Sequence, residues 1–381
     1  MAAKLKKKHV LLASLVLILL VVIGGFWLFS DSLMRRFFTP TDTKFDIGVS
    51  LPEVAVDQED VSVVAEDLSI PWEVAFLPDG DLLVTERTGS LKRIGQNQTT
   101  IEIDGVVHIG EGGLLGMAMH PDFEQNRWLY LYLTTREGDG LINRVERYEF
   151  SDNALTNRQV ILDNIPGARF HDGGRIAFGP DGFLYITTGD ALEVDLAQQT
   201  DSLAGKILRI SDTGAVPADN PFGNEVWSYG HRNPQGLAWD SNEQLWATEH
   251  GASAQDELNR IDAGNNYGWP VIEGDQTRSG MESPVVHSGT DETWAPAGMA
   301  YYDDSLFFAG LRGESLYEAQ IQADGSVELI VHLRSEFGRL RAVSLGPDGF
   351  LYITTSNTDD RGTVQPNDDK IIRINPAIFR D

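Results

Sequence analysis

The chain has 381 residues, of which 57 are acidic and 30 are basic, so its formal net charge is −27. It contains no cysteine, which excludes disulfides and lipid attachment through an N-terminal cysteine. Residues 1–40 hold six of the basic residues and one acidic residue, which leaves 24 basic and 56 acidic residues, or −32, beyond them. Such a chain repels nucleic acid and anionic lipid and suits a neutral or cationic ligand, whereas an anionic ligand would need its own basic pocket.

The first predicted element is a membrane-spanning helix. Residues 10–29 are 20 uncharged and mostly apolar residues, enough to cross a bilayer. The residues that place the N-terminus in the cytoplasm by the positive-inside rule are Lys4, Lys6, Lys7 and Lys8. The apolar run is long and no clear cleavage site follows, which favours an uncleaved anchor over a removed signal peptide. We expect an inner-membrane anchor over 1–40, a linker over 41–60, and a domain over 61–381 that faces the periplasm.

A Pro-Asp-Gly-like turn followed by an apolar strand recurs six times after the linker. The turns begin at intervals of 43 to 63 residues, near Pro78, Pro121, Pro180, Asp240, Asp303 and Pro347. Such turns occur in any all-β protein, but repeats of about this length with several short strands are typical of β-propellers. The pattern predicts an all-β, six-bladed β-propeller. We expect its first blade to begin near Val61 and the strand after Lys370 to close the ring.

The third repeat contains a candidate general base. His171 lies in the glycine-rich segment GARFHDGGRIAFGPDG, just before a strand, and the same repeat returns to Asp190 in TTGD. A carboxylate beside an imidazole fixes its tautomer and stabilises the imidazolium, which is the usual arrangement for proton abstraction. The alternative is a loop histidine held by backbone carbonyls.

Several arginines precede or follow strands of the later repeats. Arg232 and Asn233 lie directly before a strand in SYGHRNPQGLAW, and Arg312 lies in GLRGESLY. Arg339 and Arg341 are two residues apart, so both side chains would point to one face of a strand. Two such guanidinium groups repel each other unless an anion lies between them. The pattern predicts either an anion-binding pocket or pairing of each arginine with one of the many carboxylates.

The segment TEHGASAQDELNRIDAGNNYGWP is rich in oxygen donors. Calcium takes six to eight oxygens, many of them from the backbone, so this loop is a calcium candidate, although it lacks the EF-hand spacing. The side chains that could contribute are Glu249, Asp256, Glu257, Asn259 and Asp262. No glycine-rich phosphate loop, zinc-type histidine cluster or nucleophile-elbow serine is visible in the sequence.

Five segments together resemble the glucose/sorbosone dehydrogenase family. They are GEGGLLGMAMHPDF, FHDGGRIAFGPDGFLYITTGD, YGHRNPQGLAW, NNYGWP and GRLRAVSLGPDGFLYITT. The resemblance runs from about Leu68 to Ile374, and the bacterial aldose sugar dehydrogenases look most similar. Members are six-bladed propellers that use pyrroloquinoline quinone (PQQ). The resemblance implies oxidation of aldose sugars at C1 to lactones, with the electrons passing to an unidentified acceptor.

The resemblance also implies roles for single residues. His171 matches the base that takes the proton from the C1 hydroxyl while hydride passes to the quinone, and Asp190 matches its orienting carboxylate. Arg232 and Asn233 match residues that hold the quinone, the arginine lying near its reactive carbonyl. Further cofactor contacts are implied for Glu111, Arg312, Arg339 and Arg341.

The same resemblance implies two calcium sites. Gly251 and Ala252 match the positions whose backbone carbonyls bind the calcium that activates the quinone. Glu257 and Tyr267 match ligands of a second, structural calcium. Glu111 departs from the pattern of the related glucose dehydrogenases, which have Gln there. An acid at this position would either alter the pKa of the base or be held protonated.

Two other functions stay open. A calcium-dependent lactonase on a six-bladed propeller would use carboxylates and Asn in the central channel, and would have no use for Arg312, Arg339 and Arg341. A non-enzymatic propeller that binds a protein or a glycan would be marked by loss of the histidine or of the arginines, both of which are present. The short segments between repeats favour an open site with broad aldose specificity, without indicating which sugar fits.

Overall fold

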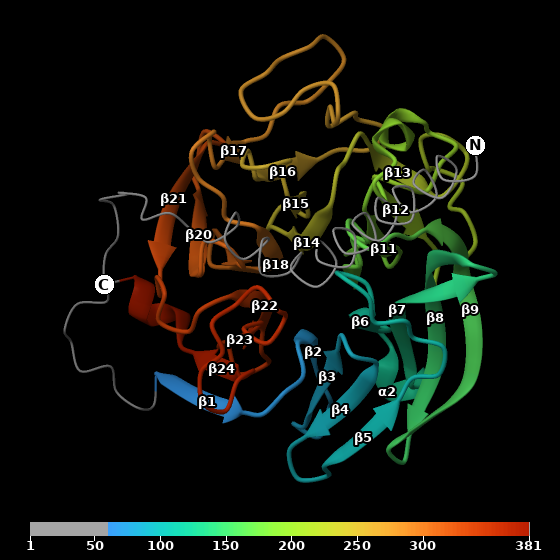
Figure 1. Ribbon diagram of the computed structural model, residues 1–381, viewed down its shortest axis with the longest axis vertical. Helices are drawn as coiled ribbons and strands as arrows, with labels where there is room; N and C mark the ends of the chain where they lie inside the picture. Colours follow the sequence, from blue (N-terminus) through green and yellow to red (C-terminus); the bar gives the residue numbers. More distant parts are fainter. Residues whose placement is uncertain (1–59, 381) are drawn as a thin grey trace, which may run out of the picture.

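The chain forms a six-bladed β-propeller. The computed structural model describes residues 60–380, so the predicted anchor and most of the linker lie outside the described residues. Six four-stranded antiparallel sheets follow one another around a central axis (Figure 1), which confirms the predicted all-β, six-bladed architecture. Within residues 60–380, no helix is long and apolar enough to cross a membrane.

The first three blades follow each other along the chain. Blade 1 consists of β2 (Pro71–Phe76), β3 (Leu82–Glu86), β4 (Ser90–Ile94) and β5 (Thr99–Glu102). Blade 2 consists of β6 (Leu114–Met119), β7 (Trp128–Glu137), β8 (Gly140–Ser151) and β9 (Ala154–Pro166), with the short helix α2 (Phe123–Asn126) between its first two strands. Blade 3 consists of β10 (Ile176–Phe178), β11 (Leu184–Thr188), β12 (Lys206–Ile210) and β13 (Val226–Tyr229), with the 3-10 helix η1 (Val194–Gln198) after β11.

The last three blades complete the ring. Blade 4 consists of β14 (Pro234–Trp239), β15 (Leu245–Glu249), β16 (Glu257–Ile261) and β17 (Val286–His287). Blade 5 consists of β18 (Pro296–Tyr302), β19 (Ser305–Gly310), β20 (Ser315–Ile321) and β21 (Val327–His332). Blade 6 consists of β22 (Leu340–Leu345), β23 (Leu351–Thr355), β24 (Ile371–Ile374) and β1 (Val61–Ala65), followed by the 3-10 helix η2 (Pro376–Phe379).

Strand β1 closes the ring from the N-terminal side. It pairs antiparallel with β24, with Val61 opposite Ile374, and is therefore the outermost strand of blade 6. Blade 1 begins only at Pro71, so the expectation that it begins near Val61 is wrong. The strand after Lys370 does close the ring as expected, because β24 lies between β1 and β23. Backbone hydrogen bonds between strands from the two ends of the domain thus close the ring.

The six turn motifs occupy the same place in every blade. Each joins the innermost strand to the second strand, as the turn at Pro78 joins β2 to β3. At Gly80 of this turn the backbone φ is +91°, a conformation that glycine adopts without strain. All six turns therefore lie at one end of the propeller. The opposite end, where the innermost strands begin and the second strands end, carries the candidate functional residues.

The core lies between neighbouring blades. One cluster joins Trp72 of blade 1, Tyr132 of blade 2 and Ile186 of blade 3, all of them buried. The second strands β3, β11, β15 and β19 are buried at every position, because each lies between two other strands and two other blades. At about 25 cal/mol per Å² of apolar surface, this burial is the main stabilising contribution to the ring.

A buried ion pair lies between the innermost strands of the propeller. The Arg175 guanidinium, at the start of blade 3, pairs with Glu73 of β2 and lies 4.2 Å from the ring of Trp72. Its Nε donates to the Gln235 carbonyl oxygen of β14 at 2.9 Å. Burial lowers the pKa of Arg175 to about 9. The pair connects blades 1, 3 and 4 at the axis.

Candidate active site

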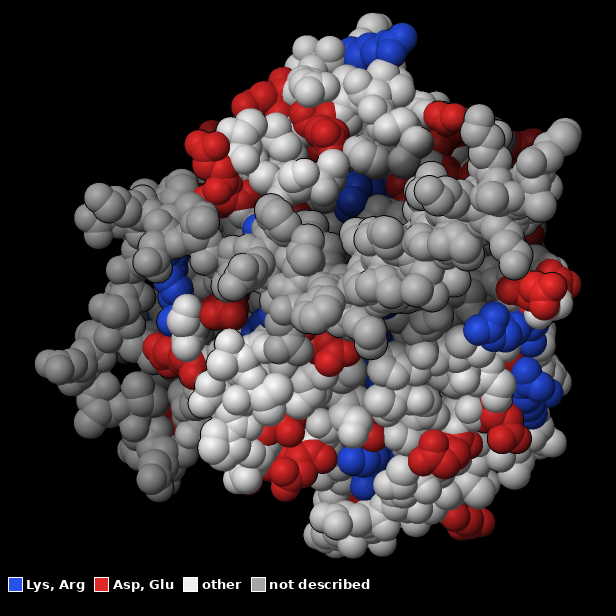
Figure 2. Space-filling model, in the orientation of Figure 1, with Lys and Arg blue, Asp and Glu red and all other residues white. Residues whose placement is uncertain are grey.

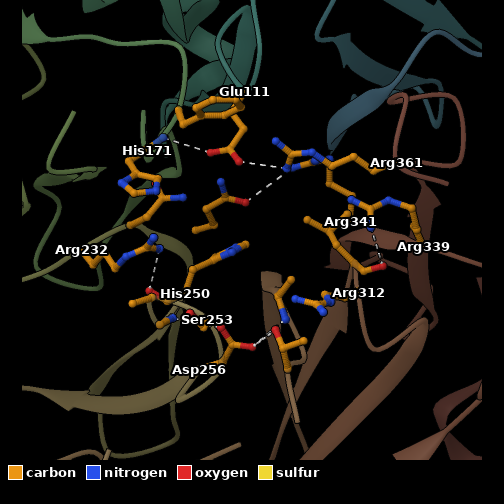
Figure 3. A pocket seen from close by; sticks show the side chains of 18 residues that line it. Glu111, His171, Arg232, His250, Ser253, Asp256, Arg312, Arg339, Arg341 and Arg361 are labelled. Carbon is orange, nitrogen blue, oxygen red and sulfur yellow. Dashed lines mark hydrogen bonds and ion pairs between the residues drawn. The ribbon is translucent and has the colours of Figure 1, made fainter. Parts of the chain in front are cut away.

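A pocket of about 240 Å³ opens at the end of the propeller where the innermost strands begin. Its lining comes from the loops at this end of the propeller and from the first residues of β14 and β22 (Figure 3). The predicted site residues that line it are Glu111, His171, Arg232, Asn233, Gly251, Ala252, Arg312, Arg339 and Arg341. Asp190 lies behind His171, and Glu257 and Tyr267 are not among the lining residues. The structure thus brings most of the predicted residues, far apart in the sequence, into one pocket.

The pocket is basic although the chain is strongly acidic. Five arginines line it, against the carboxylates of Glu111 and Asp256. Figure 2 shows acidic side chains at many places on the described surface of this face, with fewer basic ones among them. The excess of guanidinium groups at one point of a chain with net charge −27 indicates a pocket for an anionic ligand.

His171 and Asp190 form a hydrogen-bonded pair at the pocket wall. His171 Nδ1 lies 2.7 Å from Asp190 Oδ1, and the Asp190 side chain has no exposed surface. Burial alone would raise the pKa of Asp190, but hydrogen bonds from His171, Leu192 and Trp269 lower it below its usual value. An ionised Asp190 holds the proton on Nδ1, which leaves the lone pair of Nε2 for the pocket. This is the arrangement of a general base.

Glycines allow these two residues to approach each other. A Cβ at Gly189 would overlap the carbonyl oxygen of His171, so only glycine fits between the end of β11 and the His171 loop. His171 itself has a φ of +64°, a conformation that non-glycine residues adopt rarely. The sequence TTGD therefore ends a strand with the one residue that lets Asp190 contact the histidine.

Glu111 contacts the same histidine from the other side. Its Oε2 accepts a hydrogen bond from the backbone N–H of His171 at 3.0 Å, and its Oε1 lies 3.0 Å from Nη1 of Arg361. Burial would raise the pKa of Glu111, but Arg361 and the hydrogen bond from His171 hold it well below the usual range. The structure therefore favours an ionised Glu111 over a protonated one.

Arg232 has few hydrogen bonds for a partly buried guanidinium. Its Nη1 donates a long bond of 3.4 Å to the His250 carbonyl oxygen, and its Nε is buried without a hydrogen-bond partner. The neighbouring Asn233 Oδ1 accepts from the N–H of Gly173 at 3.0 Å and so holds the His171 loop. The unpartnered Nε makes Arg232 a donor for an acceptor oxygen of a ligand.

Arg339 and Arg341 share one carboxylate. Arg339 Nη2 lies 2.9 Å from Asp359 Oδ2, and Arg341 Nη2 lies 3.7 Å from the same oxygen. Burial, opposed only in part by Asp359, lowers the pKa of Arg341 to about 9. The sequence left open whether each arginine pairs with a carboxylate of the chain. Arg339 and Arg341 do pair with one, but both pair with the same one. One carboxylate for two buried guanidinium groups leaves positive charge at the pocket.

The loop after β15 presents backbone to the pocket at Gly251 and Ala252. Asp256 braces this loop, since its Oδ1 accepts from the N–H of Gly251 at 3.0 Å and its Oδ2 from Thr293 Oγ1 at 2.7 Å. The carbonyl oxygens of Gly251 and Ala252 accept no hydrogen bond from any residue in the range 60–380. In that range, no group of three or more acidic or histidine side chains is placed to hold a metal ion. Backbone carbonyls are therefore the oxygen ligands that this loop offers.

Residues 68–365 match the family model for glucose/sorbosone dehydrogenase. The chain belongs to this family. The PQQ-bound aldose sugar dehydrogenase of Streptomyces coelicolor is 42% identical, with a TM-score of 0.77 over 82% of this chain and 97% of that one. A putative glucose dehydrogenase of Thermus thermophilus is 43% identical, with a TM-score of 0.78 over 82% of this chain and 98% of that one. Aldose sugar dehydrogenase YliI of Escherichia coli is 33% identical over 334 residues, which cover 78% of this chain and 90% of that protein.

The glucose/sorbosone dehydrogenase family is an oxidoreductase family. Apart from the pocket, blade 4 of this member holds a second cluster of buried side-chain oxygens. Glu257 faces Glu249 across the β15–β16 ladder, and burial together with Glu249 raises the pKa of Glu257 to about 8. Asn259 Oδ1 is buried beside them without a hydrogen-bond partner. The Tyr267 hydroxyl already donates to the Arg260 carbonyl oxygen at 2.7 Å, so only the Tyr267 carbonyl oxygen is left to bind an ion.

His250, Asp359 and Arg361 also lie at this site and were not predicted from the sequence. His250 lines the pocket with a buried Nε2 that has no partner, and burial lowers its pKa to about 4, so its imidazole is neutral. His250 follows the second strand of its blade directly, and Asp359 and Arg361 lie in the segment after the second strand of theirs, as Asp190 does in blade 3. That shared position is the sequence signal that could have found them.

Proposed function

We propose that this protein is a PQQ-dependent aldose dehydrogenase that oxidises the sugar at C1 to a lactone. The observation that carries the proposal is the His171–Asp190 pair at the wall of a pocket lined by five arginines. PQQ is a flat tricarboxylate, and arginine offers each carboxylate a planar partner with two donors. The PQQ-bound relative of the same fold supports this choice of cofactor.

The residues present fit the cofactor. Arg312, Arg339 and Arg341 would hold its carboxylates, because all three line the pocket and Arg339 and Arg341 share the single carboxylate of Asp359. Arg232, whose Nε lacks a partner, and Asn233 would hold its quinone end. When bound, PQQ would supply the two-electron oxidant, and a calcium ion on the carbonyls of Gly251 and Ala252 would polarise it as a Lewis acid.

The protein's own contribution is proton transfer and charge stabilisation. His171 Nε2 takes the proton of the C1 hydroxyl, because Nδ1 already carries a proton toward Asp190. Asp190 stabilises the imidazolium that forms. Arg232 stabilises negative charge that develops beside it. Glu111 holds the backbone of His171 in place through its hydrogen bond.

The second calcium would be structural. Glu257 and the unpartnered Asn259 Oδ1 are the buried side-chain oxygens of blade 4 that would bind this cation. The neighbouring Glu249 already accepts hydrogen bonds from His231 Nδ1 and from the backbone N–H of Arg232. The Tyr267 carbonyl oxygen is the further ligand that the family resemblance implies. Such an ion would stabilise the loop that follows β16.

The sequence supports a place for the enzyme at the membrane. The apolar run 10–29 would anchor it in the inner membrane, with the propeller in the periplasm. There it would meet external sugars and pass electrons to an acceptor that is not identified. Segments between blades that are shorter than in the soluble glucose dehydrogenases that the chain resembles favour a broad range of aldoses, and strict selectivity for one sugar would contradict this.

The test is dye-linked oxidation of several aldoses by the full-length protein with calcium, in the presence and absence of PQQ. Quinone binding is measured in parallel by absorbance titration. Activity that requires PQQ supports the proposal. No oxidation together with no quinone binding would overturn it in favour of a binding protein, and hydrolysis of lactones without PQQ would favour the calcium-dependent lactonase.

A further inference from the structure

Trp269 contacts two residues that the proposed function uses, Asp190 beside the base and Arg232 beside the cofactor. It lies in the loop between β16 and β17 of blade 4, in the segment NNYGWP. Its indole N–H reaches Asp190, and its ring lies under Arg232. We propose that Trp269 is a positioning residue that holds the carboxylate of the base and the guanidinium of Arg232 in fixed relation to each other. This inference rests on the proposed function.

The first contact fixes the carboxylate of Asp190. Trp269 Nε1 donates to Asp190 Oδ2 at 2.9 Å. The other oxygen, Oδ1, accepts from His171 Nδ1 at 2.7 Å and from the N–H of Leu192 at 2.9 Å. With a donor on each oxygen, the buried carboxylate cannot rotate away from the histidine. The indole N–H therefore selects the orientation in which Oδ1 faces His171.

The second contact supports the guanidinium of Arg232. The Arg232 guanidinium carbon lies 5.3 Å from the centre of the Trp269 ring, within cation–π distance. The side chain has little else to hold it, because its Nη1 makes one bond of 3.4 Å and its Nε has no partner. The aromatic face is thus a main constraint on where this guanidinium lies.

Trp269 is itself held firmly between blades 3 and 4. Its backbone N–H donates to the Gly230 carbonyl oxygen at 2.9 Å. Its carbonyl oxygen accepts from Gln198 Nε2 at 2.7 Å, and Gln198 also exchanges bonds of 3.0 and 2.8 Å with Asn266. At Gly268 the φ is +90° and a Cβ would overlap the side chain of Ile272, so the preceding turn requires glycine. Because Trp269 is fixed in this way, it can hold both Asp190 and Arg232 in place.

The first test separates the two contacts. Trp269→Phe removes the indole N–H and keeps an aromatic face under Arg232. Without that donor, more of the negative charge of Asp190 remains to stabilise a protonated imidazole, so the histidine–aspartate pair binds its proton more tightly. We expect kcat to fall about tenfold and the acid limb of the pH profile of kcat/KM to move to higher pH. We expect the same shift of the His171 titration in the protein without PQQ, followed by NMR of ¹⁵N-labelled histidine.

The second test removes both contacts. Trp269→Leu should raise the Kd for PQQ by about tenfold in an absorbance titration, whereas Trp269→Phe should leave it within about threefold of the wild type. The matched control is Trp239→Phe. Trp239 ends β14 at the opposite end of the propeller and packs on Tyr185 with ring centres 5.2 Å apart. This variant should keep the wild-type pH profile and Kd.

The outcomes separate the inference from the proposed function. A wild-type protein that neither binds PQQ nor oxidises aldoses overturns the proposed function. A wild-type protein that does both, while Trp269→Phe keeps the wild-type pH profile and the wild-type histidine titration, overturns the inference alone. If circular dichroism shows that Trp269→Leu does not fold, the Phe variant decides. Its pH profile of kcat/KM reports the loss of the Asp190 contact while the aromatic ring is kept.

Discussion

Arg361 and Glu111 join blade 6 to blade 2 across the pocket. Arg361 Nη1 lies 3.0 Å from Glu111 Oε1, and Glu111 Oε2 in turn accepts from the backbone N–H of His171. The ion pair thus places a negative charge beside the base and beside the arginines that would hold the cofactor. The carboxylate both orients the histidine and offsets part of the positive charge of the pocket.

Glu111→Gln separates these two effects. The amide oxygen can still accept from His171, but the negative charge is gone and Arg361 adds to the positive charge of the pocket. We expect PQQ to bind about three- to tenfold more tightly, with kcat within severalfold of the wild type. Glu111→Ala should lower kcat further, since His171 loses its acceptor. Absorbance titration and steady-state kinetics measure both effects, and weaker PQQ binding by the Gln variant would contradict this account.

Substitution of His171 or of Asp190 should reduce turnover. His171→Ala should lower kcat by about 10²- to 10⁴-fold and leave the Kd for PQQ within about threefold. Asp190→Asn should lower kcat by a comparable factor, because an amide no longer holds the proton on Nδ1. His120→Asn is the control, because His120 lies at the turn before α2, at the other end of the propeller, and should keep full activity. Substantial turnover by His171→Ala would remove the base assignment.

Features set by interactions within one repeat could be predicted from the sequence, whereas features set by contacts between distant residues could not. The turn at Pro78 and the alternating strands are local signals, so the number of blades could be predicted. The place of β1 could not, because Val61 pairs with Ile374 at the other end of the chain. His171 and Asp190 lie within one repeat and could be identified together.

Arg361 was missed for the same reason as β1. Its partner Glu111 is 250 residues away, and no local pattern connects the two. His250 was missed because its unpartnered Nε2 becomes visible only when the strands of blade 4 place it at the pocket. Their shared position after the second strand of a blade could have marked these residues as candidates, but one sequence does not show which distant residues they contact.

Asp359 lies between Arg339 and Arg341 and neutralises one of the two charges. Burial would raise the pKa of Asp359, but the two arginines hold it well below the usual range. Asp359→Asn leaves the buried guanidinium groups without a counter-charge, so the Tm of the protein without PQQ should fall by several degrees. Added PQQ should then raise the Tm by more than it does in the wild type, because its carboxylates replace the lost charge. Equal increases in both proteins by differential scanning fluorimetry would show that the cofactor does not contact this arginine pair.

Glu318 gives a prediction for acid stability far from the pocket. This buried β20 residue accepts hydrogen bonds from Ser305 Oγ at 2.7 Å and His332 Nε2 at 2.8 Å, and it pairs with Arg380 near the C-terminus. Burial would raise its pKa, but these hydrogen bonds and Arg380 lower the pKa of Glu318 to about 2. Since the folded pKa lies below the unfolded value of about 4.3, ionised Glu318 stabilises the fold above about pH 5. That contribution is lost as the pH falls toward 2.

Glu318→Gln should therefore lower the free energy of unfolding at pH 7 by about 3 kcal/mol, the equivalent of the pKa difference. The deficit should shrink steadily between pH 5 and pH 2, because the wild type loses its ionised carboxylate there while the amide does not titrate. Urea unfolding at a series of pH values measures it, with Glu328→Gln as the control, since Glu328 is an exposed residue of the neighbouring strand β21. A deficit of the same size at pH 3 and pH 7 would mean that shape, and not the charge of Glu318, holds the C-terminal segment to blade 5.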